Sequence, residues 1–214
     1  MKALILVNGD LYRSDVLRSR IRTKTFDLVL GADRGARYAK ALDVTLNAVI
    51  GDLDSLTDLE RLDIGNSQYI SYPTGKNETD LELALLYAKK QGADNIVLVG
   101  ALGGRMDMTI GNVLLIAHNN FSSCRVEVWH GEQTGWVIRP PGEDIPGHPG
   151  DTVSLIPLSA NATGITTEGL EYSLKDEELV FGSVRGISNL MNKSSAHIKF
   201  LEGLLLAVHT SCGS

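Results

Sequence analysis

Residues 95–118 read NIVLVGALGGRMDMTIGNVLLIAH, and this stretch decides the fold. It opens with an apolar, β-branched run that is typical of a buried strand. A glycine-rich turn follows at residues 100–104, and the apolar spacing over residues 109–118 predicts a helix. A buried strand followed by a turn and a helix is the repeating unit of a mainly parallel sheet with helices on both faces.

The same unit recurs throughout the sequence before residue 95. Short apolar runs predict strands, and longer periodic stretches predict helices. The helix over residues 79–91 has the clearest start, because Thr79 and Glu82 have the spacing of a capping box. We expect strands at residues 4–7, 27–31, 48–50, 68–72 and 95–100, and helices at residues 36–42, 79–91 and 109–118.

The pattern changes after about residue 124. Residues 125–130 alternate apolar and polar side chains, as a half-buried strand does, and a Pro-Pro-Gly turn at 140–142 follows. Beyond this turn we expect only short strands, at residues 152–156, 164–166, 179–181, 196–200 and 204–209. The sequence therefore predicts an α/β domain over residues 1–122 and a small all-β sandwich or barrel over residues 123–214.

Composition and charge narrow the class of protein. The 214 residues carry a formal net charge of −6, which argues against a broad surface for nucleic acid. The two cysteines and five histidines lack the spacing of zinc ligands. No apolar run is long enough to span a membrane, and the first one is too short for an export signal, so we expect a cytoplasmic protein.

Aspartates follow the predicted strands at the sheet edge where ligands bind in such folds. Asp33 follows the second strand, and Asp52 and Asp54 follow the third. An extended Asp-x-Asp places both carboxylates on one side of the chain, and Mg²⁺ would relieve their repulsion. A turn leading into an N-capped helix explains the same aspartates equally well.

Two further clusters follow the fourth and fifth strands. Lys76 is a candidate phosphate ligand, and Asp80 begins the next helix, where a carboxylate also favours the helix N-terminus. Gly103-Gly104-Arg105 combines close backbone approach to a ligand with a guanidinium for phosphate oxygens. Asp107 either adds a metal ligand or holds Arg105 in a salt bridge. Walker A and Gly-x-Gly-x-x-Gly motifs are missing, whereas pyrophosphate transfer needs only positioning and cations around the phosphates.

Taken together, these clusters resemble the thiamine pyrophosphokinase family, in its bacterial form. In the first half the resemblance rests on residues 33–35 (DRG), 50–55 (IGDLDS), 77–84 (NETDLELA), 100–107 (GALGGRMD) and 111–112 (GN). In the second half it rests on residues 154–158 (SLIPL), 169–172 (GLEY) and 186–189 (GISN). The resemblance therefore covers most of the chain, in order.

The resemblance implies a Rossmann-like α/β domain that binds ATP and Mg²⁺, followed by a β-sandwich domain that binds thiamine and takes part in a homodimer. It implies an active site between the α/β domain of one subunit and the β domain of the other, and transfer of pyrophosphate from ATP to the thiamine hydroxyl, with AMP released. The implied catalytic and magnesium residues are Asp52, Asp54, Asp80 and Asp107. The implied nucleotide and phosphate contacts are Asp33, Asn77, Thr79 and Arg105, and the implied thiamine contacts are Ser188 and Asn189.

Several points stay open at this level. Met108 stands where the family often has His, and a polar β-turn would also explain Ser188 and Asn189. Either Asp80 or Asp107 could orient the thiamine hydroxyl. Two rival functions are a pyrophosphokinase for another heteroaromatic alcohol, such as a hydroxymethylpterin, and a non-catalytic thiamine- or nucleotide-binding regulator.

Overall fold

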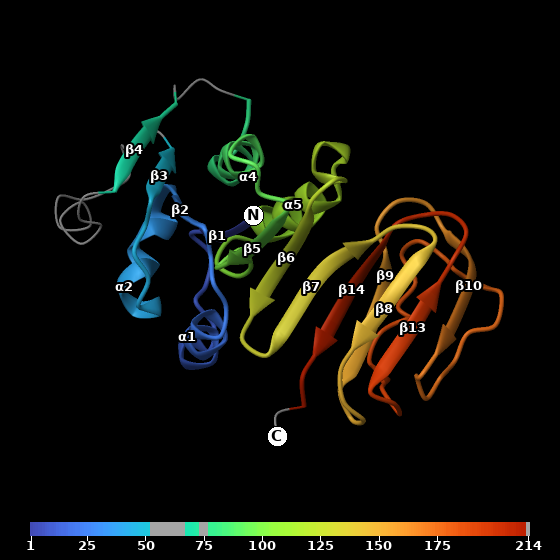
Figure 1. The fold of residues 1–214 in the computed structure, drawn as a ribbon. Helices are drawn as coiled ribbons and strands as arrows, with labels where there is room; N and C mark the ends of the chain where they lie inside the picture. The colour runs from blue at the N-terminus through green and yellow to red at the C-terminus, as the bar shows by residue number, and fades with distance from the viewer. Residues whose placement is uncertain (52–66, 73–76, 213–214) are drawn as a thin grey trace. The chain divides into compact units, whose positions relative to one another are not determined.

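The computed structural model describes residues 1–51, 67–72 and 77–212. The chain divides into two compact units, Met1–Gly131 and Glu132–Ser214. Figure 1 traces both units along the chain from the blue N-terminus to the red C-terminal strand. Each unit has its own apolar core.

A parallel sheet forms the centre of the first unit. Its strand order is β6-β5-β1-β2-β3-β4, and the neighbouring strands pair in parallel. The chain runs from β1 outward to β4 and returns to β5 on the other side of β1, so the sheet has a topological switch point between β1 and β5. The strands are β1 (Lys2–Leu6), β2 (Leu28–Ala32), β3 (Ala48–Gly51), β4 (Gln68–Ser71), β5 (Asn95–Val99) and β6 (Arg125–His130).

Helices cover both faces of this sheet (Figure 1). On one face, α1 (Ser14–Arg22) and α2 (Tyr38–Leu42) pack into a core with side chains of the strands. On the other face lie α4 (Asp80–Lys90), which contacts β1, β2 and β3, and α5 (Met106–Ala117). The described part of the unit also contains two short 3-10 helices, η1 (Asp33–Arg37) and η2 (Asn119–Phe121). Within the described residues, no helix has the length and apolarity needed to cross a bilayer.

The start of α4 confirms the predicted helix signal. Thr79 is the N-cap, and its Oγ1 accepts a hydrogen bond from the backbone N–H of Glu82 at 3.2 Å. The helix then buries one apolar stripe against the sheet, comprising Leu81, Leu83, Ala84, Leu85 and Ala88. This cap fixes where the helix begins, and it thereby places Asp80 in the first turn, beside the sheet edge.

Helix α1 was not expected from the sequence. It follows Arg13, which has φ 49° and makes no side-chain cap. Only Leu17 and Ile21 are buried, and charged side chains fill much of the remaining surface. Tertiary contacts hold the helix instead, including a hydrogen bond from Arg18 Nε to the carbonyl of Ala41 at 2.9 Å.

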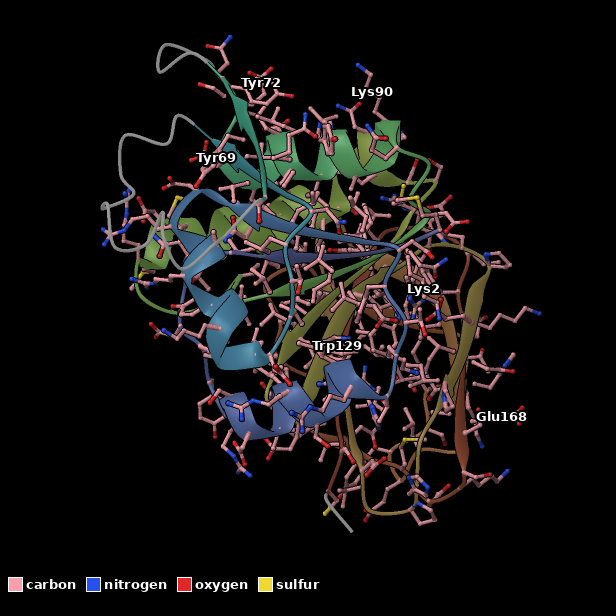
Figure 2. The ribbon with its side chains drawn as sticks, turned by 60° about the vertical axis from the view of Figure 1, so that its left-hand side comes forward. Lys2, Tyr69, Tyr72, Lys90, Trp129 and Glu168 are labelled. Atoms are coloured by element: carbon pink, nitrogen blue, oxygen red, sulfur yellow. The ribbon has the colours of Figure 1, made fainter. Side chains whose placement is uncertain are left out.

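The predicted strand at residues 125–130 is β6, and it belongs to the first unit. It pairs in parallel with β5, whereas the boundary expected from the sequence falls before it, between residues 122 and 123. The two compact units divide after Gly131. Trp129 on β6 is buried, and the Arg20 guanidinium lies 4.1 Å from its ring centre, beside α1 in Figure 2. This tryptophan is therefore a core residue of the first unit.

The second unit is the expected β-sandwich. Four strands pair antiparallel in the order β12-β9-β14-β7, and a four-stranded antiparallel sheet has the order β11-β10-β13-β8. The core between these two layers includes Trp136 and Leu205 from the first and Ile165 and Ile198 from the second. The strands are β7 (Gln133–Ile138), β8 (Gly142–Pro146), β9 (Thr152–Pro157), β10 (Ala162–Glu168), β11 (Glu177–Leu179), β12 (Asn189–Leu190), β13 (Ser195–Lys199) and β14 (Leu205–Thr210).

Candidate functional site

Asp33 and Asp80 come together at the carboxyl edge of the parallel sheet. Asp33 directly follows β2 and has a left-handed backbone with φ 47°, which is rare for a residue other than glycine. Asp80 is the first residue of α4. Both approach Gly51, the last residue of β3: a Cβ at Gly51 would lie 3.3 Å from Asp33 Cβ and 3.3 Å from Asp80 Oδ1. Two carboxylate residues that are far apart in sequence are therefore neighbours.

Three of the predicted site residues, Asp52, Asp54 and Lys76, lie outside the described residues. Within residues 1–51, 67–72 and 77–212, no group of three or more His, Cys, Asp or Glu side chains could hold a metal ion. The described residues of the predicted magnesium centre are Asp80 and Asp107. Asp33, which was predicted as a nucleotide contact, lies with Asp80 beside Gly51 and adds a second carboxylate there. Carboxylates are ligands that Mg²⁺ favours, and one or two of them suffice when waters and phosphates complete its shell.

Asn77 and Thr79 are exposed ahead of α4. Because Thr79 Oγ1 already accepts the Glu82 N–H, its described role is to cap the helix. The roles predicted for Asn77 and Thr79 toward a nucleotide remain predictions.

Arg105 and Asp107 form an ion pair at the start of α5. Arg105 Nε donates to Asp107 Oδ1 at 3.1 Å, its Nη2 donates to Oδ2, and the Met108 N–H donates to Oδ1 at 2.9 Å. The guanidinium and this N–H hold the pKa of Asp107 below its ordinary value. The Asp107 carboxylate in turn raises the pKa of Arg105. Of the two roles considered for Asp107, the structure has the salt bridge. Both side chains are exposed, so the pair adds little to stability and stays accessible to a ligand.

The glycine-rich loop before α5 is held in place by its neighbours. The Gly103 N–H donates to Thr109 Oγ1 at 3.0 Å, and the buried Asn112 side chain donates from Nδ2 to the carbonyl of Ala101 at 2.7 Å. The Gly104 N–H donates to Asp10 Oδ2 at 3.1 Å. Asp10 was not predicted as a site residue, because Asn-Gly-Asp after a strand is an ordinary turn sequence.

Ser188 and Asn189 lie in the second unit, at the start of β12. Ser188 has φ 60°, and its N–H donates to Ser154 Oγ at 3.0 Å. The Asn189 side chain makes two hydrogen bonds with the backbone of Tyr172, accepting its N–H at 3.0 Å and donating to its carbonyl at 2.7 Å. In this structure the Asn189 amide therefore fixes the neighbouring Tyr172 segment.

Asn189 also lines a cavity of about 320 Å³ in the second unit. The cavity has apolar walls with a few polar groups, the usual make-up of a small-molecule site. At its rim, Arg185 forms an ion pair with Glu177 and lowers the pKa of that carboxyl. The lining includes Leu155, Thr167, Leu170, Tyr172, Arg185 and Asn189.

Two family models match this chain, one within each unit. Residues 21–128 match the thiamin pyrophosphokinase catalytic domain, and residues 140–205 match the thiamin pyrophosphokinase vitamin B1 binding domain. The matches lie within Met1–Gly131 and Glu132–Ser214, respectively. They also agree with the order of the motifs along the sequence.

Known proteins agree with these matches. A thiamine pyrophosphokinase of Bacillus subtilis is 29% identical over 193 residues, which cover 88% of this chain and 90% of the relative. The crystal structure of thiamine pyrophosphokinase from Bacillus subtilis superposes with a TM-score of 0.87 at 25% identity, over 100% of both chains. That of thiamin pyrophosphokinase from Geobacillus thermodenitrificans gives 0.83 at 27% identity, over 100% of this chain and 99% of the other. This chain belongs to the thiamin pyrophosphokinase family.

Proposed function

We propose that this chain transfers the pyrophosphoryl group of ATP to the hydroxyl group of thiamine, giving thiamine diphosphate and AMP. The main observation behind this proposal is that Asp33 and Asp80 lie together beside Gly51, at the carboxyl edge of a parallel sheet. The chain also matches both domains of the family. Carboxylates at this edge suit a nucleotide that arrives with a metal ion.

We further propose that Mg²⁺ is the metal of this site. Asp33 and Asp80 provide hard oxygen ligands, and Asp52 and Asp54 are the expected further ligands. When bound, Mg²⁺ would supply positive charge that neutralises the charge developing on the phosphates during transfer. Asp107 is a less suitable ligand while its carboxylate is occupied by Arg105 and the Met108 N–H.

The chain's own residues have distinct tasks in this proposal. Arg105 is exposed at the N-terminus of α5, and its guanidinium can contact phosphate oxygens. Asp80 orients the thiamine hydroxyl and accepts its proton, because Arg105 and the Met108 N–H already occupy the Asp107 carboxylate. The hydroxyl oxygen forms a bond to the β-phosphorus as the bond from that phosphorus to the α,β-bridging oxygen breaks, and AMP leaves with the electron pair.

The acceptor is tested by measuring AMP release from ATP and Mg²⁺ with thiamine, with a hydroxymethylpterin, and with neither. We expect AMP only with thiamine, and none when EDTA is in excess over Mg²⁺. AMP with the pterin alone would move the function to the first rival. Tight thiamine binding without AMP formation would favour the regulator instead. The match to a vitamin B1 binding domain favours thiamine.

A homodimer with a shared site is also proposed. In the first unit, the apolar side chains of Met106, Met108, Ile110 and Leu114 on α5 are exposed. In the second unit, a second exposed apolar group comprises Val180, Phe181, Val184, Ile187 and Leu190. Exposed apolar patches of this kind are typical of interaction surfaces. The first patch starts beside Arg105 and the second contains the Ser188-Asn189 segment, so pairing them between subunits would join the two groups of predicted site residues.

Leu114→Glu should therefore dissociate the dimer, because association would bury an unpaired carboxylate. Sedimentation velocity should give twice the 23.1 kDa chain mass for the unsubstituted protein and the single-chain mass for the variant. Turnover should fall with dissociation. Tyr69→Glu, at an exposed position on the edge strand β4, serves as the control and should stay dimeric (Figure 2). A dimeric, fully active Leu114→Glu protein would contradict the proposed interface.

We place the protein in the cytoplasm. Cys124 and Cys212 are both free, and Cys212 is exposed. Exposed free thiols persist in a reducing compartment, whereas oxidising compartments favour disulfides.

A further inference from the structure

The end of β1 is joined to the glycine-rich loop at the topological switch point. The Val7 N–H donates to the Val99 carbonyl at 2.8 Å, as in the regular parallel pairing. Beyond the strand ends the pairing continues from the Gly9 N–H to the Gly100 carbonyl at 2.7 Å and from the Asp10 N–H to the Leu102 carbonyl at 2.7 Å. The backbone of residues 7–10 therefore fixes one side of the loop that leads to α5.

The Asp10 side chain fixes the other part of this loop. Its Oδ2 accepts the Gly104 N–H at 3.1 Å, and a Cβ at Gly103 would lie 2.3 Å from the same oxygen. Gly103 also has φ 85°, a conformation that suits glycine. The carboxylate thus occupies the space that any other residue at position 103 would need.

These contacts decide which part of the loop faces a ligand. The N–H groups of Gly103 and Gly104 donate to Thr109 Oγ1 and Asp10 Oδ2, respectively. Backbone N–H groups that are occupied in this way are not available to bind a phosphate oxygen. The next residue, Arg105, is exposed and carries the positive charge. The loop therefore serves to hold Arg105 in place at the switch point.

We propose that Asp10 is a positioning residue for pyrophosphate transfer, whose carboxylate holds Gly103 and Gly104 so that Arg105 faces the phosphates of ATP. The inference rests on the proposed function, since it concerns the same site. Asp10 acts through hydrogen bonding and packing, because its Oδ2 is the atom that meets both glycines. Its negative charge is not itself required.

The test compares Asp10→Ala with Asp10→Asn in steady-state assays of AMP formation. Asp10→Ala removes the acceptor, and we expect kcat/KM for ATP to fall about 10- to 100-fold, as misplacement of a substrate-binding group does. Asp10→Asn keeps an acceptor oxygen in the same place, so kcat/KM for ATP should stay within about fivefold of the unsubstituted protein. The KM for thiamine should not change in either variant. Loss of folded protein would instead lower kcat and leave both KM values unchanged.

A matched control lies at the other end of β1. Asp27 Oδ2 accepts the Lys2 N–H at 2.8 Å, so Asp27→Ala removes a similar carboxylate contact from the opposite edge of the sheet and should leave kcat/KM for ATP unchanged. In a protein that already carries Arg105→Ala, adding Asp10→Ala should lower kcat/KM for ATP by less than about a further twofold, because the two residues act together.

Equal losses of kcat/KM in Asp10→Asn and Asp10→Ala would overturn the inference and point to the charge of Asp10. An inactive unsubstituted protein would reject the proposed function, whereas a fully active Asp10→Ala variant would reject only this inference.

Discussion

Asp80→Asn should lower turnover about 10³-fold while the protein stays folded, a loss comparable to that of one transition-state-stabilising group in other enzymes. Asp80 lies beside Gly51 and Asp33, where a carboxylate can bind a cation and orient the thiamine hydroxyl. Asparagine keeps the size of the side chain but removes the charge and the proton acceptor. Turnover should be measured at saturating ATP and thiamine, across a titration of Mg²⁺.

Glu82→Gln is the matched control for this change. It neutralises a carboxylate in the same first turn of α4, and it leaves intact the backbone N–H that Thr79 caps. Both variants lose a similar favourable interaction with the helix N-terminus, so their thermal stabilities should be alike. Near-normal turnover of Asp80→Asn at any magnesium concentration would contradict the site.

Gly100→Ala should destabilise the first unit by about 3 kcal/mol, through steric overlap combined with backbone strain. Gly100 has φ 76°, and an added Cβ would lie 2.3 Å from the carbonyl oxygen of Val7 and 3.3 Å from Tyr38 Cε2. The overlap is with backbone, which can move only if the pairing between β1 and the glycine-rich loop changes. Urea unfolding followed by circular dichroism measures the change in the free energy of unfolding.

Gly92→Ala separates strain from overlap. Gly92 has φ 95°, but nothing lies within 4 Å of an added Cβ, so this variant should lose only about 1 kcal/mol. The difference between the two variants then measures the close approach of β1 to the loop. Equal destabilisation by the two changes would show that the close approach at Gly100 has no energetic weight.

The fold class could be predicted because the strands of the first unit are short apolar runs and α4 has a clear start at Thr79. Helix α1 could not, because Arg13 gives no capping signal and the helix depends on two buried side chains and on tertiary contacts. Helix α5 begins at Met106 rather than at the predicted Thr109, since the residues before its apolar stripe are exposed. Strand β7 was missed because it begins with polar residues and contains Gly135.

The site could be predicted only in part, for a different physical reason. Asp33 and Asp80 follow strands or start helices at one sheet edge, so topology alone predicts that they approach each other. The two readings of Asp107 differ only in side-chain orientation, which the sequence does not specify. The role of Asp10 could not be predicted, because it depends on contacts with Gly103 and Gly104, which are distant from it in sequence.

The most direct measurement follows the phosphorus atoms. The purified chain would be incubated with Mg²⁺, thiamine and ATP labelled at the β-phosphorus. The account predicts labelled thiamine diphosphate and unlabelled AMP in equal amounts, because the β- and γ-phosphates move together. Thiamine monophosphate formed with ADP, or label released as free phosphate or pyrophosphate with no labelled thiamine product, would contradict it.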